Sequence, residues 1–194
     1  MVHVPDLRTA LRATLEEDPR PEPAPGDRLA SVLALIVETP VPSMLFTVRA
    51  SGLSRHAGEI SFPGGLQDPG ESLVQTALRE AEEEIGLDPG LPEVLGALPA
   101  VHTHVSAILV VPFVGVLAAQ PTLSMSVAEI TDVLMFPVAR LAAVETATSY
   151  AREGGATWHG WAYEMEGHTV WGVTGWMLHT LLERMRRETP WMMD

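Results

Sequence analysis

A glycine-rich turn that runs directly into one amphipathic helix, within residues 62–87, constrains the fold of this chain most. Gly64 and Gly65 allow close approach of the backbone, and Gly70 allows a tight turn before the helix. Residues 72–85 place an apolar side chain at every fourth position, namely Leu73, Ala77, Ala81 and Ile85. This spacing predicts a helix that packs one face on a core and presents its other face to the preceding loop.

The predicted helix carries three glutamates on one face. At about 100° per residue, Glu80, Glu83 and Glu84 fall in one narrow stripe, whereas Glu82 points the opposite way. Like charges at these spacings destabilise a helix by roughly 0.2–0.5 kcal/mol per pair. A divalent cation would reverse that effect, and oxygen ligands favour Mg²⁺ or Mn²⁺ over zinc. An acidic face turned to solvent is the alternative interpretation.

Strand patterns surround this helix. Prolines at alternate positions in residues 19–25 indicate an extended connector, so we divide the chain into an N-terminal helix and connector, 1–27, and a main domain, 28–194. Apolar β-rich runs predict strands, and helical periodicity predicts helices outside the central one. The expected strands are 28–37, 43–49, 93–102, 106–117 and 130–136, and the other expected helices are 6–17 and 174–187. The fold class is therefore predicted to be α+β.

Composition excludes several kinds of chemistry. All twelve basic residues are arginine, so a phosphate-loop lysine and a Schiff-base lysine are impossible. The absence of cysteine excludes a thiolate metal site and a cysteine nucleophile. A formal net charge of −13 argues against binding to nucleic acid or to anionic membranes. The expected partner is a small molecule, and any phosphate ligand would need a metal ion.

Two further expectations concern location and the aromatic residues. The N-terminal residues lack the order of a signal peptide, and the longest uncharged apolar stretch, 105–119, is too short to span a bilayer and contains Pro112. We therefore expect a soluble, cytoplasmic protein. All five tryptophans lie after residue 157, and we expect most of them to pack in the core or against a helix.

The glycine and acid spacing resembles a known family motif. Gly65, Glu71 and then the run Arg79–Leu87 match the Nudix box, G-x5-E-x7-R-E-U-x-E-E-x-G-U, with Ala81 standing where a larger aliphatic residue is usual. The resemblance implies an α/β/α sandwich with a mixed β-sheet. It also implies Mg²⁺-dependent hydrolysis of a nucleoside diphosphate linked to another group.

The same resemblance assigns roles to the box residues. It implies that Glu80, Glu83 and Glu84 bind the metal. Arg79 would brace the loop by pairing with an acid such as Glu71, which itself either orients the loop or reaches a metal.

A second motif narrows the substrate. Residues 45–50 and 58–65 resemble the additional motif of the coenzyme A pyrophosphatase branch, although Phe46 replaces a leucine and the second motif arginine, Arg55, lies one place late. This implies cleavage of coenzyme A to adenosine 3′,5′-bisphosphate and 4′-phosphopantetheine. Arg49, Arg55 and His56 would then bind substrate phosphates, since arginine donates two hydrogen bonds to one phosphate. A surface ion pair for Arg49 and an uninvolved loop position for His56 are the alternatives.

The general base and the exact reaction stay open. A helix glutamate, Glu83 or Glu84, is one candidate for the base, and Glu129 is another, because its segment resembles the place where many relatives carry a late acidic ligand. Glu129 is equally compatible with a plain surface position. His102 and His104 follow a predicted strand; we interpret them as ordinary polar loop residues, and a position lining the cleft is the alternative. The alternative functions are hydrolysis of another nucleoside diphosphate derivative, such as a dinucleotide or a nucleotide sugar, non-catalytic nucleotide binding in regulation, and an acidic structural protein.

Overall fold

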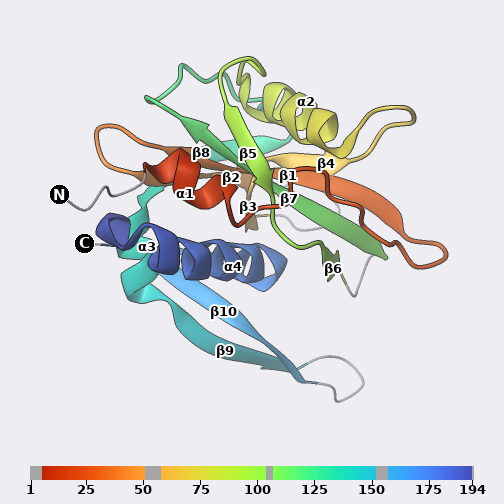
Figure 1. Ribbon diagram of the computed structural model, residues 1–194. Coiled ribbons are helices and arrows are strands. Elements are labelled where there is room, and N and C mark those ends of the chain that lie inside the picture. The colour runs from red at the N-terminus through yellow and green to blue at the C-terminus, as the bar shows by residue number, and fades with distance from the viewer. Residues whose placement is uncertain (1–5, 51–57, 104–106, 152–156, 194) are drawn as a thin grey trace.

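The computed structural model describes residues 6–50, 58–103, 107–151 and 157–193 (Figure 1). Its centre is an eight-stranded sheet with the main strand order β3-β2-β1-β7-β5, to which β4, β6 and β8 are added through β1, β7 and β2. The strands are β1 Arg28–Val37, β2 Ser43–Arg49, β3 Ile60–Ser61, β4 Gly64–Leu66, β5 Glu93–Ala97, β6 Val101–Thr103, β7 Ile108–Leu117 and β8 Ile130–Pro137. β1 and β7 pair in parallel and the other strand pairs are antiparallel, so the sheet is mixed.

Helices cover both faces of this sheet. The side chains of β1 alternate: Leu33 and Leu35 join the core under α2 (Leu73–Ile85), whereas Ala34 and Ile36 join the core under α1 (Leu7–Arg12) and α4 (Gly172–Glu188). Figure 1 shows α2 on one side of the sheet and α1 and α4 on the other. Because successive side chains of a strand point to opposite faces, a strand buried on both faces reads as a continuous apolar run. The predicted α/β/α sandwich with a mixed sheet is confirmed.

One predicted strand is interrupted and one predicted helix ends early. The expected strand 93–102 is divided into β5 and β6, because Pro99 has no N–H to donate to β7. The expected helix 6–17 ends at Arg12, and Glu16 instead exchanges backbone hydrogen bonds of 2.9 and 2.7 Å with Ala97 at the end of β5. Leu7 and Leu11 are nevertheless buried in the core, as the helical periodicity predicted.

The part of the chain after β8 was predicted least well. Helix α3 (Val138–Val144) and the antiparallel sheet of β9 (Thr146–Ala151), β10 (Thr157–Met165) and β11 (His168–Val170) were not expected; a short 3-10 helix, η1 (Pro190–Met193), follows α4. The expectation for the tryptophans was wrong for most of them. Trp171, Trp176 and Trp191 are exposed. Trp161 does pack against a helix as expected, since it stacks on His179 of α4 with ring centres 3.9 Å apart. Within the described residues, no helix combines the length and apolar content needed to cross a bilayer.

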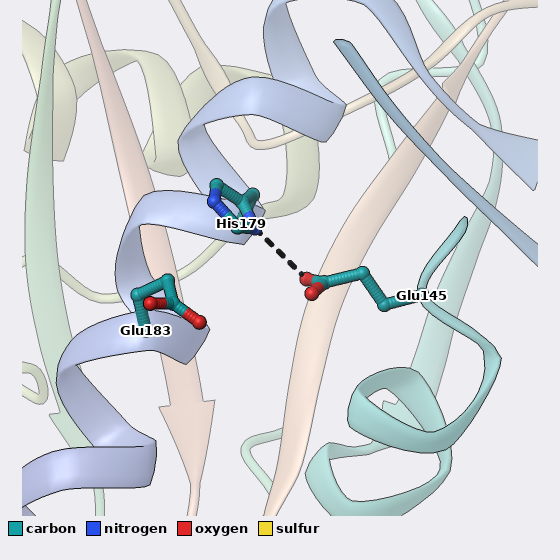
Figure 2. A group of neighbouring side chains, drawn as sticks. All are labelled: Glu145, His179 and Glu183. Atoms are coloured by element: carbon teal, nitrogen blue, oxygen red, sulfur yellow. Dashed lines mark hydrogen bonds and ion pairs between the residues drawn. The ribbon is translucent and has the colours of Figure 1, made fainter. Parts of the chain in front are cut away.

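A buried carboxylate holds the elements of this C-terminal part together (Figure 2). Glu145, directly after α3, accepts hydrogen bonds from the Tyr163 hydroxyl at 2.6 Å and from Arg186 at 2.9 Å, and its Oε2 lies 3.2 Å from Nδ1 of His179. Burial and the Glu145 carboxylate raise the pKa of Tyr163. Glu145, His179 and Glu183 have ligand atoms within 4.8 Å of one another. Arg186 already bonds both carboxylates of this group, so we interpret it as an ion-pair network that fastens α3 and β10 to α4.

Removing this carboxylate is expected to destabilise the fold. Glu145→Ala leaves the Tyr163 hydroxyl without its partner and removes one of the two carboxylates that Arg186 bonds, in a site where the Glu145 side chain is only 9% exposed. We therefore expect a loss of about 3 kcal/mol in the free energy of unfolding. Arg140→Ala is the control, because its pair with Glu166 is solvent-exposed and should contribute under about 1 kcal/mol. Urea unfolding of both variants measures the difference. Equal free energies of unfolding for the two variants would contradict a stabilising role for the Glu145 network.

Candidate active site

Helix α2 is held at both ends by local interactions. Ser72 caps its first turn in a capping box with Gln75, which satisfies two free N–H groups. Gly86 ends it in the left-handed conformation at φ 65°, where glycine is favoured. The apolar stripe predicted from the sequence is buried against the sheet. This packing leaves the glutamate face of α2 directed at the loop that precedes it.

The two glycines of β4 are required by close contacts. Gly64 pairs with Val32 of β1, and a Cβ there would overlap the backbone of Ser31 and Val32. A Cβ at Gly65 would overlap the carboxylate of Glu80. β4 therefore lies between β1 and the glutamate face of α2 without room for a side chain at Gly64 or Gly65.

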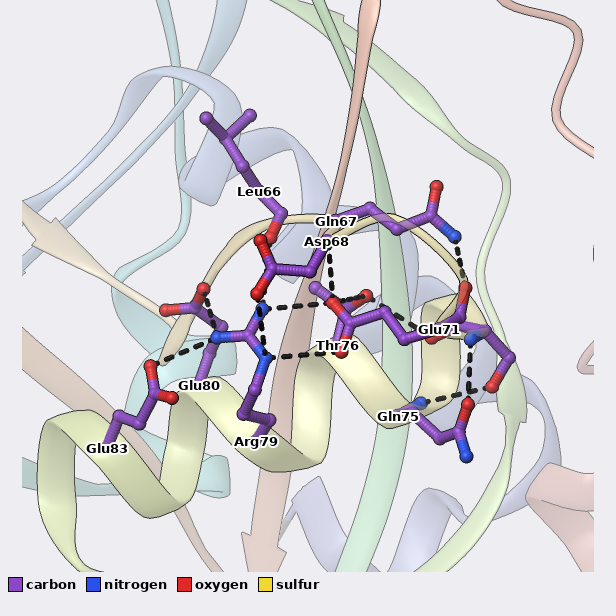
Figure 3. Close-up of polar contacts among 10 residues, drawn as sticks. Leu66, Gln67, Asp68, Glu71, Gln75, Thr76, Arg79, Glu80 and Glu83 are labelled. Atoms are coloured by element: carbon purple, nitrogen blue, oxygen red, sulfur yellow. Dashed lines mark hydrogen bonds and ion pairs between the residues drawn. The ribbon is translucent and has the colours of Figure 1, made fainter.

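Arg79 connects the loop to three carboxylates (Figure 3). Its guanidinium donates to Glu71 at 3.0 and 3.1 Å, to Glu80 at 2.9 Å and to Glu83 at 3.0 Å, and also to the carbonyl of Leu66 at 3.1 Å. The expected pairing of Arg79 with Glu71 is thus present in the geometry.

Glu71 in turn supports the loop. Its side chain also accepts from the N–H of Asp68 at 2.8 Å and from the hydroxyl of Thr76 at 2.7 Å. Hydrogen bonds from Arg79, followed by the one from Asp68, lower the pKa of Glu71 to about 2. Both oxygens of Glu71 are therefore engaged in holding the loop, which favours the orienting role among the two that the sequence left open.

Glu84 is the most buried carboxylate of the face. Its side chain is 2% exposed; one oxygen accepts the N–H of Gly64 at 3.1 Å and the other lies 3.5 Å from Nη1 of Arg49. Burial raises the pKa of Glu84 to about 7, and burial also raises the pKa of Glu80. Arg49 is thus brought to the acidic face itself, rather than to a surface acid.

Glu129 reaches the same place through a loop docked on the end of α2. The N–H groups of Ser124 and Ser126 donate to the carbonyls of Ile85 and Glu84 at 2.8 and 2.9 Å, so they satisfy two carbonyls at the helix end. The carbonyl of Glu129 accepts from Ala50 next to Arg49 at 2.8 Å, and its exposed carboxylate is close enough to contribute to the raised pKa values of Glu80 and Glu84, although less than burial does. The serine contacts were not predicted, because they depend on backbone groups that carry no sequence signal.

The remaining predicted residues are placed elsewhere. Arg55, His56 and His104 lie outside the described residues. His102 is not a loop residue: it lies in β6, and its ring nitrogen is 2.6 Å from a carboxylate oxygen of Asp27. This hydrogen bond to a residue just before β1 explains why a polar side chain occupies the strand.

The donor set fits a divalent cation. Glu80, Glu83, Glu84 and Glu129 offer four carboxylates, and Glu71 lies behind Arg79. In the described part of the chain, Arg79 pairs with Glu71, Glu80 and Glu83, and Arg49 pairs with Glu84. The excess of negative charge, with Glu84 removed from water, is the kind of site that Mg²⁺ or Mn²⁺ stabilises.

A cavity of about 400 Å³ adjoins these residues on the α4 side of the sheet. Arg49, Gly64 and Gly65 form its wall next to the carboxylates. The exposed Trp171 and the half-buried Val173, at the start of α4, form another part of the wall, and the sequence analysis did not predict either residue to lie at the site.

Comparisons with known proteins agree with this architecture. Residues 27–154 match the model of the NUDIX domain. Proteins described as uncharacterized Nudix hydrolase NudL are similar along most of their length: the one from Escherichia coli is 36% identical over 79% of this chain and 81% of that protein, and the one from Pectobacterium atrosepticum is 34% identical over 88% and 89%.

The fold also resembles the NUDIX domain of Shewanella oneidensis NrtR, solved with ADP ribose, with a TM-score of 0.54 at 17% identity over 84% of this chain and 88% of that one. With the box residues assembled between β4 and α2, these similarities show that this chain belongs to the Nudix hydrolase family.

Proposed function

We propose that this Nudix hydrolase cleaves the diphosphate of coenzyme A, giving adenosine 3′,5′-bisphosphate and 4′-phosphopantetheine, with Mg²⁺ or Mn²⁺ as cofactor. The observation that carries the proposal is the position of Arg49, the first arginine of the coenzyme A motif, 3.5 Å from the buried Glu84 and on the wall of the adjoining cavity. A cation at that point can bind a phosphate that lies beside the carboxylates.

In this proposal the residues of the site have different roles. Glu80, Glu83 and Glu84 would hold the metal, and Arg79 with Glu71 keeps the loop and two of these carboxylates in place. When bound, the metal neutralises diphosphate charge and lowers the pKa of a water ligand. We assign acceptance of the water proton to Glu129, because its carboxylate is exposed beside Glu80 and Glu84 and is not among the acids that Arg79 contacts.

Product identification tests the proposal. The purified protein is incubated with Mg²⁺ and, separately, coenzyme A, ADP-ribose, a dinucleoside polyphosphate and a nucleotide sugar, and the products are identified by mass spectrometry. We expect coenzyme A to be turned over with the highest kcat/KM. Preferred hydrolysis of another diphosphate would overturn the coenzyme A assignment and leave the family unchanged, whereas binding without hydrolysis would favour a regulatory role.

Replacing Arg49 is expected to weaken catalysis on two related substrates equally. Arg49→Ala should lower kcat/KM by about tenfold or more with both coenzyme A and its 3′-dephospho form, because a charge-assisted contact of about 1.5–3 kcal/mol is lost beside the diphosphate. Steady-state kinetics with Arg140→Ala as the surface control measures this. A much larger loss with coenzyme A than with the dephospho form would instead place Arg49 on the 3′-phosphate.

A further inference from the structure

The cavity beside the carboxylates is directly connected to the reacting end of the site. Gly64 lines it and donates its N–H to Glu84, and Arg49 lines it and pairs with the same carboxylate. Because β4 has no side chain at Gly64 or Gly65, only one layer of backbone separates the cavity from the glutamate face of α2. A substrate whose diphosphate lies at the carboxylates therefore has one of its two flanking groups at the mouth of this cavity.

The cavity walls are mostly hydrocarbon. The side chains come from both long central strands, from the segment before β4 and from the start of α4; they include Ala30, Val32, Ile60, Ile108, Val110 and Val173. Two of its hydroxyl groups are engaged within the protein: Ser61 lies 3.3 Å from the Thr47 hydroxyl, and Thr103 bonds both backbone groups of Ile108 at 2.9 and 3.1 Å. Burying a polar group without a partner is unfavourable, so these walls favour an apolar ligand group.

The two groups that flank the diphosphate of coenzyme A differ in this respect. On one side is a nucleoside, whose base and ribose carry several hydrogen-bonding atoms that need partners. On the other is the pantetheine arm, in which one CH₂ group joins the phosphate ester oxygen to a carbon bearing two methyl groups, and the hydroxyl and amide groups follow. Arg49, Glu59 and Thr174 also line the cavity and are polar enough for those few groups. A volume of about 400 Å³ lies within the usual range for small-molecule sites.

We infer that this cavity binds the pantetheine arm of the substrate, with the exposed Trp171 at its wall covering the arm. The inference rests on the proposed function and adds the orientation of the substrate: the arm lies on the α4 side of β4, and the nucleoside lies away from the cavity. Val173, half-buried on the first turn of α4, is then a specificity-determining residue.

Binding of the two products separately tests this orientation. Isothermal titration of the intact protein with Mg²⁺ measures Kd for 4′-phosphopantetheine and for adenosine 3′,5′-bisphosphate. Val173→Phe fills part of the cavity and should raise the Kd for 4′-phosphopantetheine about tenfold. The Kd for adenosine 3′,5′-bisphosphate should change by less than about twofold. Val173→Thr, nearly the same shape, should cause a smaller loss in the same direction. Val74→Phe, a half-buried valine of α2 beside a different cavity, is the matched control.

The outcomes separate the inference from the proposed function. Weaker binding of adenosine 3′,5′-bisphosphate alone, or unchanged binding of both products to folded Val173 variants, overturns the orientation even if coenzyme A is hydrolysed. Failure of the wild-type protein to hydrolyse coenzyme A overturns the proposed function, and selective loss of 4′-phosphopantetheine binding would then still assign the cavity to an apolar arm.

Discussion

Glu84→Gln is expected to lower kcat by about a hundredfold or more while the melting temperature of the metal-free protein holds or rises. The substitution removes a charge that would hold the metal, and metal stabilisation of a diphosphate contributes several kcal/mol to catalysis. Stability should not fall, because the carboxylate is 2% exposed and its burial is costly, whereas the amide oxygen can still accept the Gly64 N–H.

The control for this prediction lies on the same helix. Glu82→Gln changes the same charge on the exposed opposite face of α2 and should leave kcat within about twofold. Kinetics with Mg²⁺, and again after chelation with EDTA, together with thermal unfolding in EDTA, give all the required values. Full turnover by Glu84→Gln, or by the wild-type protein in EDTA, would refute the metal assignment.

Gly64→Ala is expected to cost about 3 kcal/mol or more of unfolding free energy, which corresponds to roughly 6–12 °C in melting temperature. The added Cβ would overlap backbone atoms of Ser31 and Val32, and backbone in the middle of a sheet cannot move aside as a flexible side chain can. β4 must therefore separate from β1, which also moves the Gly64 N–H away from Glu84.

Gly90→Ala provides the comparison, since a Cβ there meets only the Asp88 carboxylate at 3.3 Å. We expect a change within about 0.5 kcal/mol for that variant. Thermal and urea unfolding of both variants measure the two losses of stability. Similar stabilities would mean that β4 tolerates a side chain at Gly64 and that its close approach to β1 is not required.

Much of the fold follows from local patterns. The stripe Leu73, Ala77, Ala81 and Ile85 predicted α2 to within a residue, and the long apolar runs predicted β1, β2, β7 and β8 closely, because burial of a regular element imposes its period on the sequence. The segments after β8 were missed, since short strands such as β11 and a seven-residue helix such as α3 contain too few residues for a period to emerge.

The candidate site likewise contains residues that local spacing predicted and residues that it could not place. Spacing within residues 65–87 was sufficient to put Glu80, Glu83 and Glu84 on one helix face and to identify the Nudix box, because these residues are neighbours along one helix and one turn. Arg49 and Glu129 come from distant strands and loops, and spacing alone could not establish that they meet Glu84.

What the sequence by itself determined is the chemistry available: carboxylates on one face, glycines before them, arginine as the only strong cation, and no lysine or cysteine. Only the tertiary structure decided which of several side chains of the same type are buried and which are exposed. Glu84 lies in the interior and Glu83 in water although they are adjacent in sequence, and the apolar walls formed by Val32, Val110 and Val173 meet only when β1, β7 and α4 pack together. Burial and cavity shape depend on contacts between residues far apart in the chain, which no local pattern encodes.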